Sequence, residues 1–212
     1  MSKGKSIYQE KLESLLQEIS DFEKKPSLLL HACCGPCSSY VLEYLSKYFD
    51  ITILYYNPNI YPQEEYVRRF EELKSFLKEF PAGKNIELFE IEYNQEEFYQ
   101  GIGIKENPEL AKEAEKGERC RRCYKLRLLK SIEFAEKNNF DYFCTTLSIS
   151  PFKDARKINE EGEKLCFERK SKVKWLYSDF KKKQGFLRSL ELSEEYGLYR
   201  QEYCGCIFSI KN

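Results

Sequence analysis

The sequence predicts an α/β fold, a three-layer sandwich with a mainly parallel sheet of about five strands. Two observations support this prediction. Short apolar segments alternate along the chain with longer stretches of helical periodicity, and several of the short segments are apolar throughout. Strands of that kind are buried on both faces, as in a parallel sheet covered by helices. Ligands of such sheets bind beyond the carboxyl ends of the strands, so residues just after a predicted strand are candidate site residues.

The first half of the chain is expected to contain three helices and three strands. Gly35-Pro36 and Asn57-Pro58-Asn59 are typical of breaks, and each follows an apolar run. In chain order we expect a helix over 6–22, a strand over 27–32, a helix opening at 38, a strand over 51–56, a helix over 62–80 and a strand over 86–93.

The second half begins with a polar stretch, residues 101–118, expected to be a long loop or a lid with a short helix. After it we expect a helix from about 123 to 138, a strand over 142–147, a helix over 154–169, a strand over 173–177 and a last helix. The chain shows no repeat, low-complexity linker or domain boundary. Residues 1–212 are therefore expected to form one catalytic domain, with an N-terminal amphipathic helix within 1–26.

The composition excludes several classes of protein. Hydrophobic residues make up 42% and aromatic residues 15% of the chain, which excludes a largely disordered protein. Lys and Arg number 35, as do Asp and Glu, so a chain-wide basic field for nucleic acid is absent. No apolar run reaches membrane-spanning length and the charged start is unlike a signal peptide, so we expect a cytoplasmic protein without a membrane partner.

Nine cysteines are a high number for 212 residues, and seven of them fall into three tight groups. The groups are Cys33-Cys34-Gly35-Pro36-Cys37, Cys120-Arg121-Arg122-Cys123 and Cys204-Gly205-Cys206. A secreted disulfide scaffold would be shorter and carry a leader, so the groups indicate metal binding, redox chemistry or both. Because His31 is the single histidine, the composition favours zinc or an iron–sulfur cluster over metals that prefer imidazole.

The first two groups each lie where a helix is expected to begin. Such a place offers free N–H groups and a partial positive charge, which lower the pKa of a thiol. Cys120 and Cys123 have the usual spacing of two ligands to one metal centre. The neighbouring residues Arg119, Arg121 and Arg122 would offset the negative charge of a thiolate-bound cluster.

The remaining cysteines are interpreted separately. Cys204 and Cys206, two residues apart, fit a redox-active dithiol or a ligand pair for a second metal, the alternative being an unused tail. Cys144 and Cys166 are solitary and expected in the core. His31, inside a predicted strand, is expected to be a buried histidine with satisfied hydrogen bonds rather than a ligand.

Two segments are locally basic. Residues 119–130 hold six bases and no acid, and residues 164–188 hold nine bases and two acids, with aromatic residues interleaved. This pattern is typical of single-stranded RNA recognition, although a solvated charged face is the more common explanation. The candidate RNA contacts are Arg119, Arg121, Arg122, Lys181, Lys182 and Lys183.

With the motifs HACCGPCSS (31–39), ERCRRCYKLR (118–127) and QEYCGC (201–206), the chain resembles the cobalamin-independent epoxyqueuosine reductases (QueH type) from about Leu28 to Cys206. The resemblance implies reduction of epoxyqueuosine to queuosine at the wobble position of tRNA, the last step of queuosine biosynthesis. It implies an α/β sandwich akin to the nucleotide alpha-hydrolase (HUP) fold. It also implies a [4Fe-4S] cluster bound by Cys33, Cys34, Cys120 and Cys123, with Cys204 and Cys206 as a redox-active pair.

Two versions of the chemistry stay open. Cys37, Cys204 and Cys206 could hold one additional iron ion that acts as a Lewis acid on the epoxide oxygen. Alternatively, Cys204 and Cys206 supply both electrons as a dithiol and close to a disulfide. Glu202, Tyr203 and Asp154 are candidate proton donors, and an unidentified electron donor is a further partner besides the tRNA.

Two other classes of protein are alternatives to an epoxyqueuosine reductase. An iron–sulfur-dependent tRNA sulfur-transfer enzyme would need a phosphate-binding loop after the first strand, where this chain has ACCGPCSS instead of Gly-Gly-x-Asp. A non-catalytic, zinc-stabilised RNA-binding module would purify colourless and leave Cys204-Gly205-Cys206 unexplained.

Overall fold

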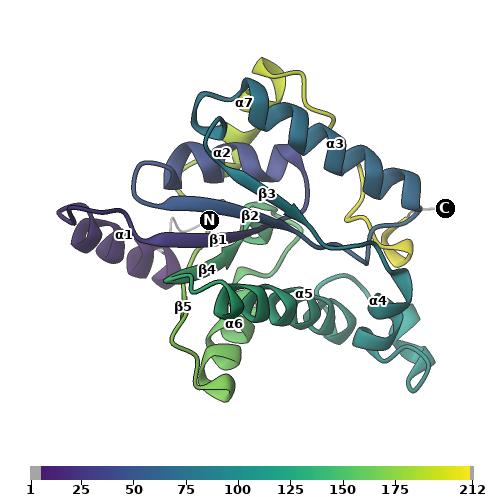
Figure 1. Cartoon of the computed structure of the whole chain (residues 1–212). Helices are drawn as coiled ribbons and strands as arrows, with labels where there is room; N and C mark the ends of the chain where they lie inside the picture. Colours follow the sequence, from purple (N-terminus) through teal and green to yellow (C-terminus); the bar gives the residue numbers. More distant parts are fainter. Residues whose placement is uncertain (1–5, 211–212) are drawn as a thin grey trace.

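Residues 6–210 are described by the computed structural model, whose central feature is a five-stranded sheet with all strands parallel (Figure 1). The strands are β1 (Ser27–Ala32), β2 (Asp50–Tyr55), β3 (Glu87–Glu90), β4 (Tyr142–Thr145) and β5 (Lys174–Trp175). Their order is β3-β2-β1-β4-β5, so the chain starts in the centre and winds outward in both directions. This is the order of a doubly wound sheet, and it confirms the predicted α/β class with a parallel five-stranded sheet.

Helices cover both faces of the sheet and complete three layers (Figure 1). One face carries α2 (Gly35–Leu45), α3 (Gln63–Glu79) and α7 (Gly185–Glu195), and the other carries α4 (Gln95–Ile102), α5 (Glu118–Lys137) and α6 (Ala155–Arg169). The predicted N-terminal helix is α1 (Ile7–Ile19), and residues 1–5 of the predicted segment 1–26 lie outside the described residues. Within the described part of the chain, no helix combines the length and the apolarity needed to cross a bilayer.

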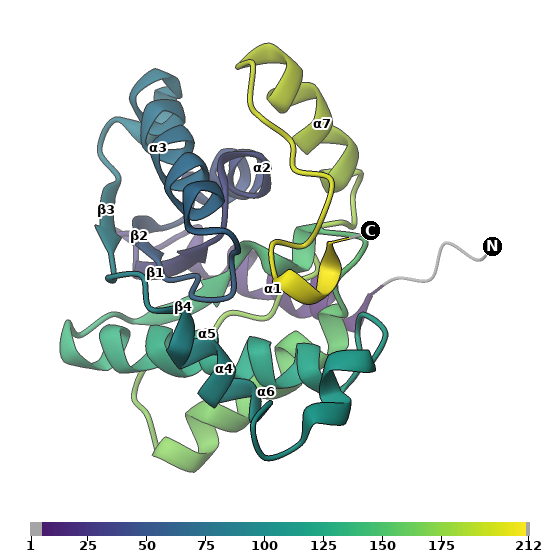
Figure 2. The ribbon, with the colours of Figure 1, turned by 90° about the vertical axis from the view of Figure 1, so that its right-hand side faces the viewer.

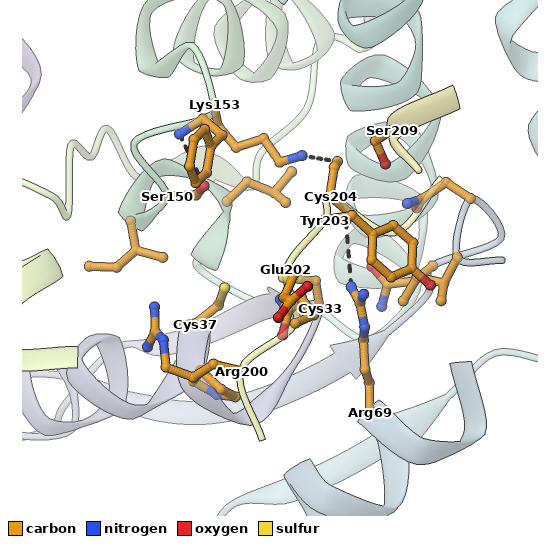
Figure 3. A pocket seen from close by; sticks show the side chains of 18 of the residues that line it. Cys33, Cys37, Arg69, Ser150, Lys153, Arg200, Glu202, Tyr203, Cys204 and Ser209 are labelled. Carbon is orange, nitrogen blue, oxygen red and sulfur yellow. Dashed lines mark hydrogen bonds between the residues drawn. The ribbon is translucent and has the colours of Figure 1, made fainter. Parts of the chain in front are cut away.

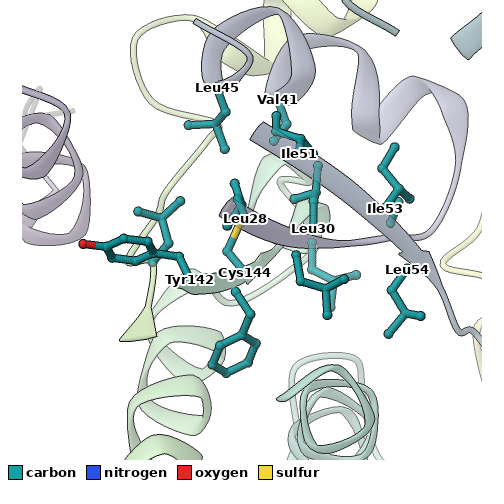
Figure 4. Close-up of a cluster of buried hydrophobic side chains, with 14 of the residues drawn as sticks. Leu28, Leu30, Val41, Leu45, Ile51, Ile53, Leu54, Tyr142 and Cys144 are labelled. Carbon is teal, nitrogen blue, oxygen red and sulfur yellow. The ribbon is translucent and has the colours of Figure 1, made fainter. Parts of the chain in front are cut away.

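The core forms because β1 and β2 are apolar on both faces. Leu28 and Leu30 of β1 pack near Val41 of α2, and all three side chains are fully buried (Figure 4). Each such side chain stabilises the fold by about 1.5–3 kcal/mol relative to an exposed one. Cys144 of β4 lies in the same core, and burial raises the pKa of its thiol, which confirms its prediction as a core residue. Cys166 is half-buried and packs against this core.

His31 is fully buried near the carboxyl end of β1. Its Nδ1 lies 2.8 Å from the Thr145 hydroxyl and its Nε2 lies 3.0 Å from the carbonyl oxygen of Tyr56. Burial lowers the pKa of the imidazole to about 4, so the ring is neutral near pH 7. The structure therefore confirms a buried histidine with both nitrogens satisfied.

Several boundaries differ from the predictions. α2 begins at Gly35 rather than at residue 38, because Pro36 fits the first turn of a helix, where its missing N–H has no partner to lose. α5 begins at Glu118 rather than near residue 123, so Cys120 and Cys123 both lie on its first two turns. The polar stretch 101–118 contains a 3-10 helix, Pro108–Lys112.

The sequence reading missed one helix altogether. α4 begins after Asn94, whose side-chain oxygen accepts a hydrogen bond of 3.1 Å from the N–H of Glu96. This is an ordinary helix cap, and Asn94 was a usable signal for it. The helix matters for the site because its buried Phe98 and Ile102 pack against Cys123 and Cys206.

Candidate active site

The first cysteine group lies at the carboxyl end of the central strand. Cys33 follows β1, Cys34 is the residue before α2, and Cys37 lies in the first turn of that helix. The three sulfur atoms lie within 4.8 Å of one another. Three thiols this close could hold a metal ion, because each offers one soft ligand atom to the same point.

The three thiols of this group differ in pKa. Hydrogen bonds from Cys34 and Cys37 lower the pKa of Cys33 well below its usual range, although burial acts in the opposite direction. The hydrogen bond to Cys33 raises the pKa of Cys34 to about 12, and the pKa of Cys37 is likewise raised by its hydrogen bonds to Cys33 and Cys34. Without a metal, the group therefore favours a single thiolate, on Cys33.

The second and third cysteine groups meet around a smaller cavity. Cys120, Cys123, Cys204 and Cys206 line it together with Lys153. The Lys153 ammonium donates a hydrogen bond to the sulfur of Cys204 (Figure 3). A hydrogen bond from Cys206 and then the Lys153 charge hold the pKa of Cys204 well below its usual range, against the effect of burial. The structure thus brings together two pairs that are about eighty residues apart, numbered 120/123 and 204/206.

Arg127 of α5 connects the two cavities, since it lines both. Its Nε donates to the carbonyl oxygen of Cys123 at 3.2 Å, and its Nη2 is buried without a hydrogen-bond partner among the described residues. Burial disfavours the charged guanidinium, but the thiols of Cys123, Cys204 and Cys33 raise its pKa above the usual value. A buried, partly unpaired cation between two thiol groups needs negative charge nearby. The residues present therefore fit an anionic, thiolate-bound metal cofactor.

The segment after α7, residues 197–206, forms a strap that carries the third cysteine group. Figure 2 shows it running from the layer of α2, α3 and α7 down toward α4 and α5. The amide of Gln201 donates to the sulfur of Cys34 at 3.2 Å. The Tyr203 hydroxyl donates to the carbonyl oxygen of Tyr61 at 2.6 Å, and the Tyr61 N–H donates to the carbonyl oxygen of Gly205 at 2.8 Å. The strap is therefore held by contacts with distant parts of the chain.

A cavity of about 390 Å³, here called the main cavity because residues of the first and third cysteine groups line it, opens beside them (Figure 3). Cys33 and Cys37 line one part of it and Cys204 another, and the strap residues Glu202 and Tyr203 also line it. The volume is in the range of cavities that bind small molecules or a single nucleoside. The cavity thus places a bound molecule in reach of both thiol groups. Its further polar lining includes Asn57, Asn59, Arg69, Lys153, Arg200 and Gln201.

The residues predicted to contact RNA differ in how far their side chains are buried. Arg119 is only 2% exposed, and its Nη1 donates to the carbonyl oxygens of Leu110 and Ala111 at 2.7 and 3.0 Å. This burial speaks against a phosphate contact by Arg119, whose side chain holds the 101–118 segment against α5. The other candidates reach the surface, several of them in ion pairs: Arg121 with Glu161, Arg122 with Glu118, Lys181 with Asp179 and Lys183 with Glu13, while Lys182 is half-buried.

Sequence reasoning missed the charged residues that support the thiols. Lys153 lies in the loop before α6, and Arg69 lies on α3, where its Nε donates to Glu65 at 2.6 Å and its Nη1 reaches the carbonyl oxygen of Cys204 at 3.4 Å. Neither residue is near a cysteine in the sequence, so spacing gave no signal for them. Asp154, a candidate proton donor, instead caps α6 by accepting hydrogen bonds from the N–H groups of Arg156 and Lys157.

Comparison with known proteins agrees with this geometry. Residues 28–212 match the family model described as "Epoxyqueuosine reductase QueH". The chain is 42% identical over 190 residues to the epoxyqueuosine reductase QueH of Streptococcus pyogenes serotype M1, covering 88% of this chain and 71% of that protein. It is 37% identical over 211 residues to the protein of the same name from Staphylococcus epidermidis, covering 99% and 87%. A third, from Thermotoga maritima, is 32% identical over 185 residues, covering 87% and 90%. The chain therefore belongs to the QueH family of epoxyqueuosine reductases.

Proposed function

We propose that this chain is an epoxyqueuosine reductase, an oxidoreductase that removes the epoxide oxygen of epoxyqueuosine at the wobble position of tRNA and leaves the alkene of queuosine. The observation that carries the proposal is the main cavity, which Cys33 and Cys37 line together with Cys204 of the strap. Removing an epoxide oxygen as water consumes two electrons and two protons. A pocket with redox-capable sulfur on two sides suits that demand.

For the cofactor, the proposal is a [4Fe-4S] cluster on Cys33, Cys34, Cys120 and Cys123. Bound there, the cluster would supply electrons one at a time, and one additional iron on Cys37, Cys204 and Cys206 would polarise the epoxide C–O bond. The buried Arg127 supports a cluster between the groups, because its charge acts on Cys33 and Cys123 alike. The 4.8 Å grouping of Cys33, Cys34 and Cys37 allows a second partition, in which these three sulfurs serve one metal centre.

The chain's own residues have definable tasks in this proposal. Lys153 keeps positive charge at the Cys204 sulfur and so favours its thiolate, the form that binds metal or forms a disulfide. Glu202 and Tyr203 line the main cavity, and Glu202 is the proposed proton donor to the departing oxygen, because the Tyr203 hydroxyl donates its hydrogen to the carbonyl oxygen of Tyr61. The basic residues Arg121, Arg122 and Lys181–Lys183, which are half-buried or exposed, remain the proposed contacts for the anticodon loop of the tRNA substrate.

The test is anaerobic purification followed by iron and sulfide counts and a turnover assay. We expect a brown protein with about four irons and four sulfides per chain, or about five irons if the extra ion is present. Given a chemical one-electron reductant, it should convert epoxyqueuosine in an anticodon stem-loop RNA to queuosine, detected by mass spectrometry of the digested RNA. A colourless, zinc-containing protein without turnover would favour the RNA-binding module, and ATP-dependent sulfur incorporation would favour the sulfur-transfer enzyme.

A further inference from the structure

Two buried asparagines line the main cavity just beyond β2. Asn57 is 1% exposed and Asn59 is 2% exposed. The side-chain oxygen of each is buried without a hydrogen-bond partner among residues 6–210. A buried acceptor that finds no donor costs about as much free energy as a lost hydrogen bond, so paired oxygens of this kind are the rule in folded proteins. Two such oxygens in one cavity indicate a ligand that donates hydrogen bonds.

The orientation of the Asn57 amide is fixed by its other end. Its Nδ2 donates to the carbonyl oxygen of Ala32 at 2.8 Å, and a carbonyl can only accept. The amide therefore cannot be flipped, and Oδ1 is the atom left free. Ala32 immediately precedes Cys33 in the chain, so this free acceptor is tied to the backbone beside the first cysteine group.

The chemistry proposed above does not use these two oxygens. Neutral amides neither carry electrons nor supply protons at the pH of the cell, and the thiols provide soft ligands enough for a cluster. Both asparagines line the cavity that Cys33 and Cys37 also line, and the reacting end of a substrate would lie in that cavity. For epoxyqueuosine, that end is a cyclopentane ring that bears the epoxide and two hydroxyl groups, whereas the purine-like base lies at the other end of an aminomethyl link.

We propose that Asn57 and Asn59 accept hydrogen bonds from the ring hydroxyl groups of epoxyqueuosine and so select the ring-bearing base, an inference that rests on the proposed function. The ring carries two hydroxyl groups with one hydrogen each to donate, so each can pair with one asparagine oxygen, and a base without the ring would leave both oxygens unpaired. Sites built to pair a substrate hydroxyl discriminate strongly against analogues that lack it. The two asparagines are thus specificity-determining residues at the reacting end of the pocket.

The experiment compares three anticodon stem-loop RNAs that differ at the wobble base: one with queuosine, one with the aminomethyl-deazaguanine that lacks the ring, and one with guanosine. Binding to the iron-loaded protein is measured for wild type, Asn57→Leu and Asn59→Leu. The matched control is Asn138→Leu, because Asn138 makes the same kind of bond, from Nδ2 to the carbonyl oxygen of Phe134 at 2.8 Å, at the far end of α5.

We expect each pocket variant to lose roughly tenfold in affinity for the queuosine RNA, the value of one buried hydrogen bond, and about twofold or less for the other two RNAs. The control should change none of the three affinities, and all proteins should keep their iron and sulfide. Equal losses for the queuosine and aminomethyl RNAs would assign the acceptors to the amine and overturn the assignment to the hydroxyls. Equal losses for all three, or no loss for any, would overturn the inference altogether.

Two features keep the test decisive. Loss of the bond to Ala32 could unfold Asn57→Leu, so Asn59→Leu, supplemented by Asn59→Ala, carries the test if that variant is insoluble. The failure of the proposed function would look different, because wild type would then neither prefer the queuosine RNA nor convert the epoxide.

Discussion

The two cysteine groups that line the main cavity are placed by different means. Cys33, Cys34 and Cys37 sit on a strand–turn–helix unit, so their sulfurs meet through local geometry within five residues. Cys204 and Cys206 sit on the strap, which has no regular structure and depends on contacts with α3, with the loop before α6 and with residues near Tyr61. The β1–α2 unit therefore places the first group by itself, whereas the second group is in place only when the strap packs against the rest of the protein. Damage to the first group should remove the proposed cluster, whereas loss of a cysteine of the second group should leave a folded protein that keeps the proposed cluster but does not turn over.

The largest expected effect comes from removing one cysteine of each group. Cys33→Ala should abolish activity and strip iron and sulfide, because it removes the thiolate that the group favours. Cys204→Ala should also abolish turnover, yet keep the sulfide count, because the strap is not part of the β1–α2 unit. Metal and sulfide analysis with the turnover assay measures both.

Iron content then separates the two versions of the chemistry. Loss of a single iron in Cys204→Ala supports the additional ion, and an unchanged iron count leaves the dithiol version. The control is Cys166→Ala, outside all three groups, which should keep both iron and activity. Loss of the sulfide in Cys204→Ala would contradict the division into a cofactor-bearing unit and a docked strap.

A smaller effect is expected where the strap meets the loop before α6. Lys153→Met removes the ammonium that bonds Cys204, so the pKa of that thiol should rise and less of it should be thiolate. We expect roughly a tenfold loss of kcat, because the thiolate is the reactive form. The pH dependence of alkylation of the metal-free protein reports the thiolate directly. Lys157→Met is the matched control, because the Lys157 ammonium donates to an exposed carbonyl oxygen, that of Lys116, and not to a thiol. An unchanged alkylation profile in Lys153→Met would show that the Cys206 hydrogen bond and the Arg127 charge keep the pKa of Cys204 low without Lys153.

The same contrast explains how far the sequence could predict the site. The position of Cys33 after a central strand followed from an apolar run and a Gly-Pro break, because both signals are local. The meeting of Cys120 and Cys123 with the strap cysteines could not be inferred from spacing, since docking of the strap decides it. The resemblance supplied the idea of a shared centre, but it gave no place to Lys153.

Sequence reasoning missed or misinterpreted residues whose role depends on tertiary contacts. In the sequence, Asn57 and Asn59 indicated only the end of a strand, because an unpaired buried oxygen can be recognised only once its neighbours are known. Arg119 counted as a surface cation because its segment is basic, whereas the fold turns it inward onto two carbonyl oxygens. The sequence gives the charge of a segment, but only the folded structure shows whether a charged side chain in it is buried or faces solvent.

The smallest and most selective effect concerns two glycines of the strap. Gly205 has a φ of +117°, and a Cβ there would lie 2.9 Å from Nη1 of Arg69, the group that also reaches the carbonyl oxygen of Cys204. Gly197 has a φ of +59°, and a Cβ there would meet no heavy atom within 4 Å. Both Gly→Ala variants should therefore carry backbone strain of about 1–3 kcal/mol and lower Tm by a few degrees, but only Gly205→Ala should also displace the strap at Cys204.

We expect Gly205→Ala to lower kcat severalfold with iron and sulfide retained, and Gly197→Ala to leave kcat close to that of wild type. Thermal unfolding and turnover, measured on the same anaerobic preparations, separate strain from displacement, because strain alone changes Tm in both variants. If Gly197→Ala lost as much activity as Gly205→Ala, the strap would act as one rigid unit from α7 onward. The position of Cys204 would then depend on the whole segment rather than on its contacts with Arg69 and Lys153. The segment that docks as a unit would in that case begin at α7 and include the whole strap.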